Sequence, residues 1–228
     1  MKDDPRNYLF ESYVKILEYY QPKFFVFENV KGILSANNKK AFPMIIKEFS
    51  DAGYHVTYKL LNSSDYGVPQ KRERVIIIGF RNKEDFQKFN FPHPVPLKDR
   101  KVLRDVIIEE ANHDEKLFFS EKAVSGMMAV REKMNKGRIQ SLDEPCNTIS
   151  SHLAKISLNS TDPVYFFDGR YRRFSCEEAA RIQSFPNDFD FANLSQGRKY
   201  KAIGNAVPPL LGKAIGIAVK KALNENKI

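Results

Sequence analysis

Three short polar segments of the 228-residue sequence combine residue types that could bind or protonate a substrate. The first, Phe27-Glu28-Asn29-Val30, places a carboxylate directly after a run of apolar residues, at the end of an expected strand. Open α/β sheets bind their ligands beyond strand ends, and a partly desolvated glutamate there could share a proton with a substrate nitrogen. The alternative is a Glu-Asn pair that only begins a turn.

The second segment, Gln70-Lys71-Arg72-Glu73-Arg74, stands between a Gly-Pro loop and an apolar run. In an extended chain the side chains of Gln70, Arg72 and Arg74 lie on one side, which predicts an array of donors for a base edge or a phosphate. The alternative is a charged entrance to a strand, with arginines that extend to water.

The third segment, Gly204-Asn205-Ala206-Val207-Pro208-Pro209, precedes an apolar helical pattern. Its glycine allows the backbone to approach another group closely, for example a small ligand. The alternative is an ordinary tight turn before a helix.

The elements that must position these segments alternate between strand and helix patterns, which predicts an α/β layer fold. A first helix is expected to begin at Asp4-Pro5, and a second to bury Met44, Ile45 and Phe49 and to end at Gly53. The short apolar runs are expected to be strands covered on both faces. The expected helices are 4–20, 41–52 and 210–223, and the expected strands are 24–27, 54–60 and 75–78.

A proline-rich, irregular stretch with scattered basic residues follows the last expected strand. Regular structure returns at Ser175, which forms a predicted capping box with Glu178. We therefore expect three segments: 1–81 in a catalytic α/β domain, 82–170 as a separate small domain, and 171–228 in the catalytic domain again, with a frayed end after 223.

The overall charge and the cysteines limit the possible partners and the cellular location of the protein. A formal charge of +9 favours a polyanionic partner such as nucleic acid. The two cysteines, Cys146 and Cys176, have no metal-ligand spacing, so we expect neither a disulfide nor a metal site. With no apolar signal segment and no expected membrane span, a soluble, cytoplasmic protein is predicted.

Taken together, the three segments resemble the DNA cytosine-5 methyltransferase family, and a fourth strengthens the match. Arg173 to Pro186 is similar to the penultimate motif of that family, with its arginine, capping serine, Glu-x-Ala-Arg and Gln-x-Phe-Pro in register. The resemblance runs from the first helix to the C-terminus and is weakest in the central stretch, where the family has its target-recognition region. It implies a partial doubly wound, Rossmann-like sheet that uses S-adenosylmethionine, plus a small target-recognition domain.

The family flips a cytosine out of double-stranded DNA, and a cysteine thiolate then attacks its C6. By resemblance, Glu28 binds the ring N3 and the exocyclic amine, and Asn29 helps to shape the nucleophile's loop. Arg74 lies near the flipped base, while Gln70 and Arg72 support that loop and the DNA side of the cleft.

Three further roles follow from the same resemblance. Asn205 and Ala206 match positions near the amino-acid end of the methyl donor. Thr148, in a Thr-Ile pair, matches a residue that approaches the DNA backbone. Arg173, Glu178 and Arg181 match structural positions.

Two family motifs have no match in this sequence: the Phe-x-Gly-x-Gly loop of the methyl donor and the Pro-Cys-Gln turn that carries the nucleophile. Pro145-Cys146 stands in the wrong order and suits the recognition region, and Cys176 suits a helix start. We therefore expect the chain to be the C-terminal half of such an enzyme, inactive alone and completed by a second polypeptide that carries both motifs.

The alternatives are a truncated copy without a partner and a DNA-binding protein that has lost catalysis. A restriction-modification system would suit the layout.

Overall fold

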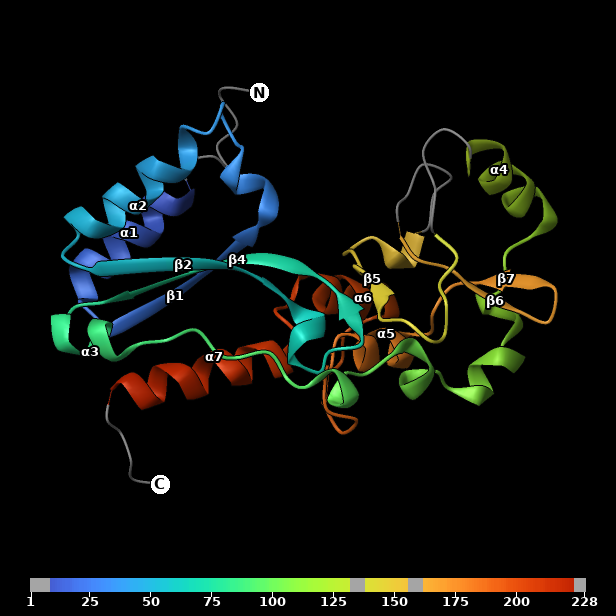
Figure 1. Cartoon of the computed structure of the whole chain (residues 1–228). Coiled ribbons are helices and arrows are strands. Elements are labelled where there is room, and N and C mark those ends of the chain that lie inside the picture. Colours follow the sequence, from blue (N-terminus) through green and yellow to red (C-terminus); the bar gives the residue numbers. More distant parts are fainter. Residues whose placement is uncertain (1–8, 132–137, 156–161, 224–228) are drawn as a thin grey trace. The chain divides into compact units, whose positions relative to one another are not determined.

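The structure is a computed structural model that describes residues 9–131, 138–155 and 162–223. It divides into two compact units (Figure 1). The α/β unit comprises 1–61, 73–93 and 214–228, and the irregular unit comprises 62–72 and 94–213. These boundaries differ from the predicted ones, because 171–213 make most of their contacts in the irregular unit and 82–93 make theirs in the α/β unit. The predicted start at Asp4-Pro5 and the frayed end lie outside the described residues.

The α/β unit is built on a three-stranded sheet in the order β1-β4-β2. Strand β4 (Glu73–Phe80) lies in the middle, between β1 (Phe24–Val30) and β2 (His55–Asn62), and it pairs antiparallel with β1. Its side chains from Val75 to Ile78 have no exposed surface. A continuous apolar run is therefore central, as the sequence predicts, and the α/β class is confirmed.

Helices α1 (Leu9–Tyr20) and α2 (Ala41–Asp51) cover one face of this sheet, and the C-terminal part of α7 (Pro209–Ala222) lies along the other (Figure 1). The α1 and α2 side packs as a cluster of aromatic and aliphatic side chains. Helix α2 buries Phe42, Ile45 and Phe49 at helical spacing, whereas Met44 is exposed, so the prediction for Met44 is wrong. Gly53 follows the helix with a φ of 89°, as expected for a glycine that ends a helix.

Strand β1 is not covered on both faces, contrary to prediction. Phe25 is buried in the cluster under α1 and α2, but Phe24 and Val26, which point to the opposite face, are 37% and 38% exposed. β1 is an edge strand, and its face opposite α1 and α2 is only partly covered. An apolar run predicts a strand but not how many of its faces are covered.

The irregular unit contains short elements and few strand ladders. Two-residue strands β3 (Gln70–Lys71) and β5 (Cys146–Asn147) pair in parallel, and β6 (Tyr165–Phe167) and β7 (Arg170–Arg172) form a hairpin. The irregular unit contains the α-helices α4 (Glu121–Arg131), α5 (Cys176–Ile182) and α6 (Gln196–Asn205). Two further short helices, α3 (Lys83–Lys88) and η2 (Lys31–Leu34), belong to the α/β unit. The 3-10 helices of the irregular unit are η3 (Ser63–Tyr66), η4 (Leu97–Asp99), η5 (Leu103–Val106), η6 (Glu109–His113), η7 (Glu115–Leu117) and η8 (Leu153–Lys155).

A buried ion pair organises the start of α5. Ser175 and Glu178 form the predicted capping box, and both carboxylate oxygens of Glu178 also accept hydrogen bonds from Arg172, at 2.7 and 2.8 Å. Arg172 donates in addition to Asn112 Oδ1 at 2.9 and 3.0 Å. Neither member of the ion pair has any exposed side-chain surface. The sequence indicated the capping box but not that Arg172 pairs with its glutamate.

One helical stretch, Gln196–Ala222, has the length and apolar composition of a membrane span, contrary to the expectation that no stretch would. This is weak evidence, because the core helices of soluble proteins meet the same criteria. Within the stretch, α6 ends at Asn205 and α7 begins at Pro209, and Leu211 and Ile215 are buried in the protein.

Candidate functional site

Glu28 and Arg74 form an ion pair in the α/β unit. The Nε of Arg74 lies 2.7 Å from Oε1 of Glu28, and the two side chains are 13% and 28% exposed, respectively. Arg74 also donates through Nη1 to the carbonyl oxygen of Glu73 at 2.7 Å. The pair is thus partly desolvated but still reachable, so its remaining hydrogen-bonding capacity is available to a ligand.

The strand register explains why these two residues meet. In the antiparallel pairing of β1 with β4, Arg74 lies opposite Val30 and Ile76 lies opposite Glu28. Alternate residues of a strand share a face, so Glu28 reaches Arg74 diagonally, on the face that points away from α1 and α2. The sequence predicted both residues for the site, and the structure brings them together.

Asn29 points to the opposite face of β1 from Glu28, because the two residues are adjacent in the strand. Its side-chain oxygen accepts a hydrogen bond from the amide of Val30 at 2.8 Å. Its expected role in shaping a nucleophile's loop stays a prediction. Nearby, Lys31 and Glu73 form an exposed ion pair at 3.0 Å.

Gln70 and Arg72 do not form the predicted donor array for a base or a phosphate. Both belong to the irregular unit and are buried, with exposed fractions of 0% and 3%. Gln70 binds the side chain of Gln183 and the amide of Ile149, and Arg72 donates to two backbone carbonyls. Side chains with so little exposed surface are not placed to contact DNA directly, and their hydrogen bonds join protein segments instead.

The residues predicted for DNA backbone and methyl-donor contact lie in the irregular unit too. Thr148 is partly exposed, and its hydroxyl donates to the carbonyl oxygen of Lys71 at 2.8 Å. Asn205 is exposed at the last residue of α6. Ala206 is half-buried, and its carbonyl accepts from Gln183 at 3.0 Å.

Neither cysteine is prepared to act as a nucleophile. Cys146 is fully buried in the apolar core of the irregular unit, and this burial raises the pKa of its thiol. Burial and the neighbouring Glu177 raise the pKa of Cys176 to about 11. Because the thiolate is the reactive form, these raised pKa values disfavour either thiol as a nucleophile near neutral pH. Cys176 is the first residue of α5, as predicted.

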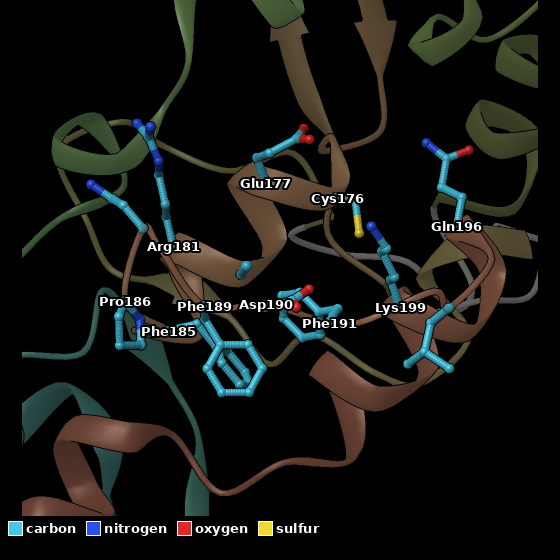
Figure 2. A pocket seen from close by; sticks show the side chains of 13 residues that line it. Cys176, Glu177, Arg181, Phe185, Pro186, Phe189, Asp190, Phe191, Gln196 and Lys199 are labelled. Carbon is cyan, nitrogen blue, oxygen red and sulfur yellow. The ribbon is translucent and has the colours of Figure 1, made fainter.

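A pocket of about 410 Å³ opens beside Cys176 in the irregular unit (Figure 2). Phe185, Phe189 and Phe191 form one wall, with ring centroids 4.8 to 5.2 Å apart. Arg181, which resembled a structural residue, contributes to the lining, as do Glu177, Asp190 and Lys199. None of the residues predicted to bind cytosine, DNA or the methyl donor lines this pocket.

Two buried hydrogen-bonded groups were not predicted from the sequence: the contacts of Gln183, and the pairing of Arg172 with Asn112. Gln183 belongs to the Gln-x-Phe-Pro segment noted in the sequence, but the segment did not indicate its partners. Among the described residues, no group of three or more His, Cys, Asp or Glu could hold a metal ion.

Comparison with known proteins defines the class of this protein. The family profile "C-5 cytosine-specific DNA methylase" matches residues 1–221. The Type II methyltransferase M.FnuDI of Fusobacterium nucleatum is 37% identical over 249 residues, which cover 99% of this chain and 72% of that protein. M.MthTI of Methanothermobacter thermautotrophicus is 35% identical, with coverage of 97% and 73%. The chain therefore belongs to the C-5 cytosine-specific DNA methylase family, whose members use S-adenosylmethionine.

Solved structures support the Rossmann-like fold of the family. The S. pombe Dnmt2 methyltransferase matches with a TM-score of 0.73 at 18% identity, over 97% of this chain and 74% of that one. The Entamoeba histolytica methyltransferase EhMeth matches with a TM-score of 0.69 at 18% identity, over 99% and 71%.

The expectation that the chain is a C-terminal half is wrong. The family profile matches from residue 1 to residue 221, and the chain spans 72% of the length of M.FnuDI. The expectation rested on two short motifs that the sequence lacks. Missing motifs do not show how much of a relative's length the chain spans. The comparisons give no support for a second polypeptide either, so that expectation remains a proposal.

Of the two residues assigned by resemblance to the methyl donor, only Asn205 has an exposed side chain. The side chain of Asn205 is open to solvent and could receive a polar group of the ligand. The carbonyl of Ala206 already accepts a hydrogen bond from Gln183, which fixes the backbone beside Asn205.

Proposed function

We propose that this protein binds a cytosine flipped out of double-stranded DNA and takes part in methylation of its C5 within a restriction-modification system. The ion pair of Glu28 with Arg74 carries the proposal. Glu28 shares a proton with the ring N3 and accepts a hydrogen bond from the exocyclic amine, while Arg74 keeps the carboxylate oriented. S-adenosylmethionine supplies the methyl group when bound. Membership of the family and relatives named as Type II methyltransferases support the reaction class.

Other residues divide the remaining tasks. Thr148 contacts the DNA backbone through its partly exposed side chain, and the positive formal charge of +9 favours association with DNA. Asn205 and Ala206 contact the amino-acid end of the methyl donor. Two free, buried cysteines support a reducing, cytoplasmic setting.

The experiment compares the affinity of the chain for duplexes that carry either cytosine or an abasic site at the target position, after the target has been selected from a random duplex library. We expect Glu28→Ala to weaken binding of the cytosine duplex by about tenfold and to leave binding of the abasic duplex unchanged, because only cytosine offers the hydrogen bonds that Glu28 would make. Glu73→Gln, which alters an exposed glutamate beside Arg74, should leave both affinities unchanged. An equal effect of Glu28→Ala on the two duplexes, or no effect, overturns the assignment.

We further propose that the 228 residues do not transfer methyl groups alone, because the family chemistry needs a thiolate, whereas burial raises the pKa of both thiols present. A second polypeptide that carries Pro-Cys-Gln and Phe-x-Gly-x-Gly would complete the site. The measurement is transfer of tritiated methyl to duplex DNA, with and without such a polypeptide. Transfer by the chain alone would contradict this proposal, and its loss in Cys146→Ser or Cys176→Ser would identify the nucleophile.

The same cysteine chemistry favours a second candidate, a DNA-binding protein without catalysis. Tight, sequence-selective DNA binding that is unchanged in Glu28→Ala, with no methyl transfer under any complementation, would favour that function. Restored transfer that depends on Glu28 favours the enzyme.

A further inference from the structure

A chain of buried hydrogen bonds around Gln183 joins three segments of the irregular unit. Gln70 accepts from the amide of Ile149 at 3.0 Å and donates to Oε1 of Gln183. Gln183 in turn donates through Nε2 to the carbonyls of Ile203 at 2.8 Å and Ala206 at 3.0 Å. Both glutamine side chains have no exposed surface.

Arg72 supplies a second connection between the same segments. Its Nη1 donates to the carbonyl of Ile149 at 3.2 Å and its Nη2 to the carbonyl of Gly204 at 3.0 Å. Here the backbones approach so closely that a Cβ on Gly204 would lie 2.3 Å from the carbonyl carbon and oxygen of Ser150. The glycine is therefore required by contact between two protein segments.

We propose that Gln183 is a positioning residue that fixes the segment of Thr148 and Ile149 relative to the segment of Asn205 and Ala206. The inference rests on the proposed function, in which the first segment contacts DNA and the second contacts the methyl donor. Gln183 does not touch Thr148 or Ile149 directly and acts on them through Gln70.

The chemistry of the amide explains why a glutamine is needed here. Its oxygen accepts one hydrogen bond and its nitrogen donates two, so an apolar replacement leaves Gln70 and two carbonyls without this partner. An apolar side chain could fill the space beside Ile182 and Ile203. It would not fix the positions of the hydrogen-bonded segments relative to one another. A fully connected buried polar network fixes one arrangement.

The first test measures amide hydrogen exchange of Ile149 in the full chain. Gln183→Met keeps the side-chain length and removes its hydrogen bonds, and we expect exchange of the Ile149 amide to increase by about tenfold. Tyr200→Phe is the matched control: it deletes another buried hydrogen bond of the same unit, from the Tyr200 hydroxyl to the carbonyl of Phe174 at 2.8 Å, outside this network. Equal acceleration in both variants would mean a general loss of stability and would overturn the proposal.

The second test is a double-mutant cycle on duplex affinity with Thr148→Val. If Gln183 acts by positioning Thr148, Gln183→Met weakens binding by about tenfold in wild type but has little further effect when Thr148 is already valine. Additive effects contradict positioning. Should Thr148→Val alone leave affinity unchanged, the proposed DNA contact of Thr148 fails, whereas the exchange measurement still decides the role of Gln183.

Two more variants keep the test decisive. Gln183→Glu retains an oxygen for Gln70 and, when protonated, one donor, so it should recover part of the Ile149 protection that Gln183→Met loses. If Gln183→Met does not fold, Gln70→Glu replaces it at a pH where the carboxyl group is ionised, because it keeps an acceptor for Ile149 and then has no donor for Gln183. Unchanged Ile149 exchange in Gln70→Glu, relative to wild type, would overturn the proposal.

Discussion

The interactions that stabilise the interior of the α/β unit differ from those that stabilise the interior of the irregular unit. In the α/β unit the central strand and two helices bury apolar side chains, with Phe49 in ring contact with Tyr13, Phe25 and Phe27. In the irregular unit Arg172, Glu178, Gln70 and Gln183 are buried among apolar residues and bind backbone groups. A sheet satisfies its own backbone, whereas a chain with short strands must satisfy buried backbone groups with side chains. Replacing a buried polar side chain should therefore lower the unfolding free energy of the irregular unit more than that of the α/β unit.

The largest expected effect is that of Glu178→Ala. It leaves Arg172 as a buried charge without its carboxylate partner, so the irregular unit should lose about 3–5 kcal/mol of unfolding free energy. Urea unfolding with hydrogen exchange assigns the loss to that unit. The neighbouring Glu177→Ala is the control, and a loss of less than about 1 kcal/mol in Glu178→Ala would show that the ion pair does not organise the unit.

Phe49→Ala tests the apolar side of the comparison. The variant leaves a cavity among the rings under α1 and α2, and we expect a loss of about 3 kcal/mol in the α/β unit. Met44→Ala on the same helix removes an exposed side chain and should cost much less. The measurement is again urea unfolding, and similar losses in the two variants would contradict the burial of Phe49 in this cluster.

A smaller effect separates two glycines. A Cβ at Gly204 meets backbone at 2.3 Å, whereas one at Gly79 meets the ring of Phe25 at 2.2 Å. Because a ring can rotate and backbone cannot, Gly204→Ala should cost about 2–3 kcal/mol and Gly79→Ala about 1–2 kcal/mol. Thermal unfolding measures both, and the reverse order would mean that the irregular backbone adapts more easily than the sheet.

The smallest expected effect is a pH dependence in the irregular unit. Hydrogen bonds from Arg170 lower the pKa of Glu115 from its ordinary value of 4.5. A carboxyl whose pKa is lower in the folded state stabilises the fold above pH 4.5 and loses this contribution as the pH falls through the folded-state pKa. Glu115→Gln should therefore slightly reduce the dependence of the unfolding free energy on pH in that acidic range. An unchanged profile would mean that water screens this exposed pair completely.

Sequence patterns predicted the α/β unit well, because strand and helix periodicities report local burial. In that unit the run Val75–Ile78 predicted a buried strand, and Glu28 and Arg74 were assigned to one site. In the irregular unit, Ser175 and Glu178 predicted the cap of α5. The predictions failed where a neighbour decides burial. Met44 is exposed although it is apolar, and Gln70 is buried although it lies in a charged run.

The sequence by itself determined the class of the protein, since the order of its polar segments is specific to the C-5 cytosine-specific DNA methylase family. It also indicated a strand at 24–27, because apolar runs are typical of strands. The strand in fact continues to Val30, so Glu28 lies within β1 and not after it, since pairing with β4 extends the strand past the apolar run. Only the tertiary structure decided that Arg74 meets Glu28 while Arg72, two residues earlier, binds Ile149 and Gly204. The partner of a long, flexible side chain depends on segments distant in sequence, and local spacing carries no information about them.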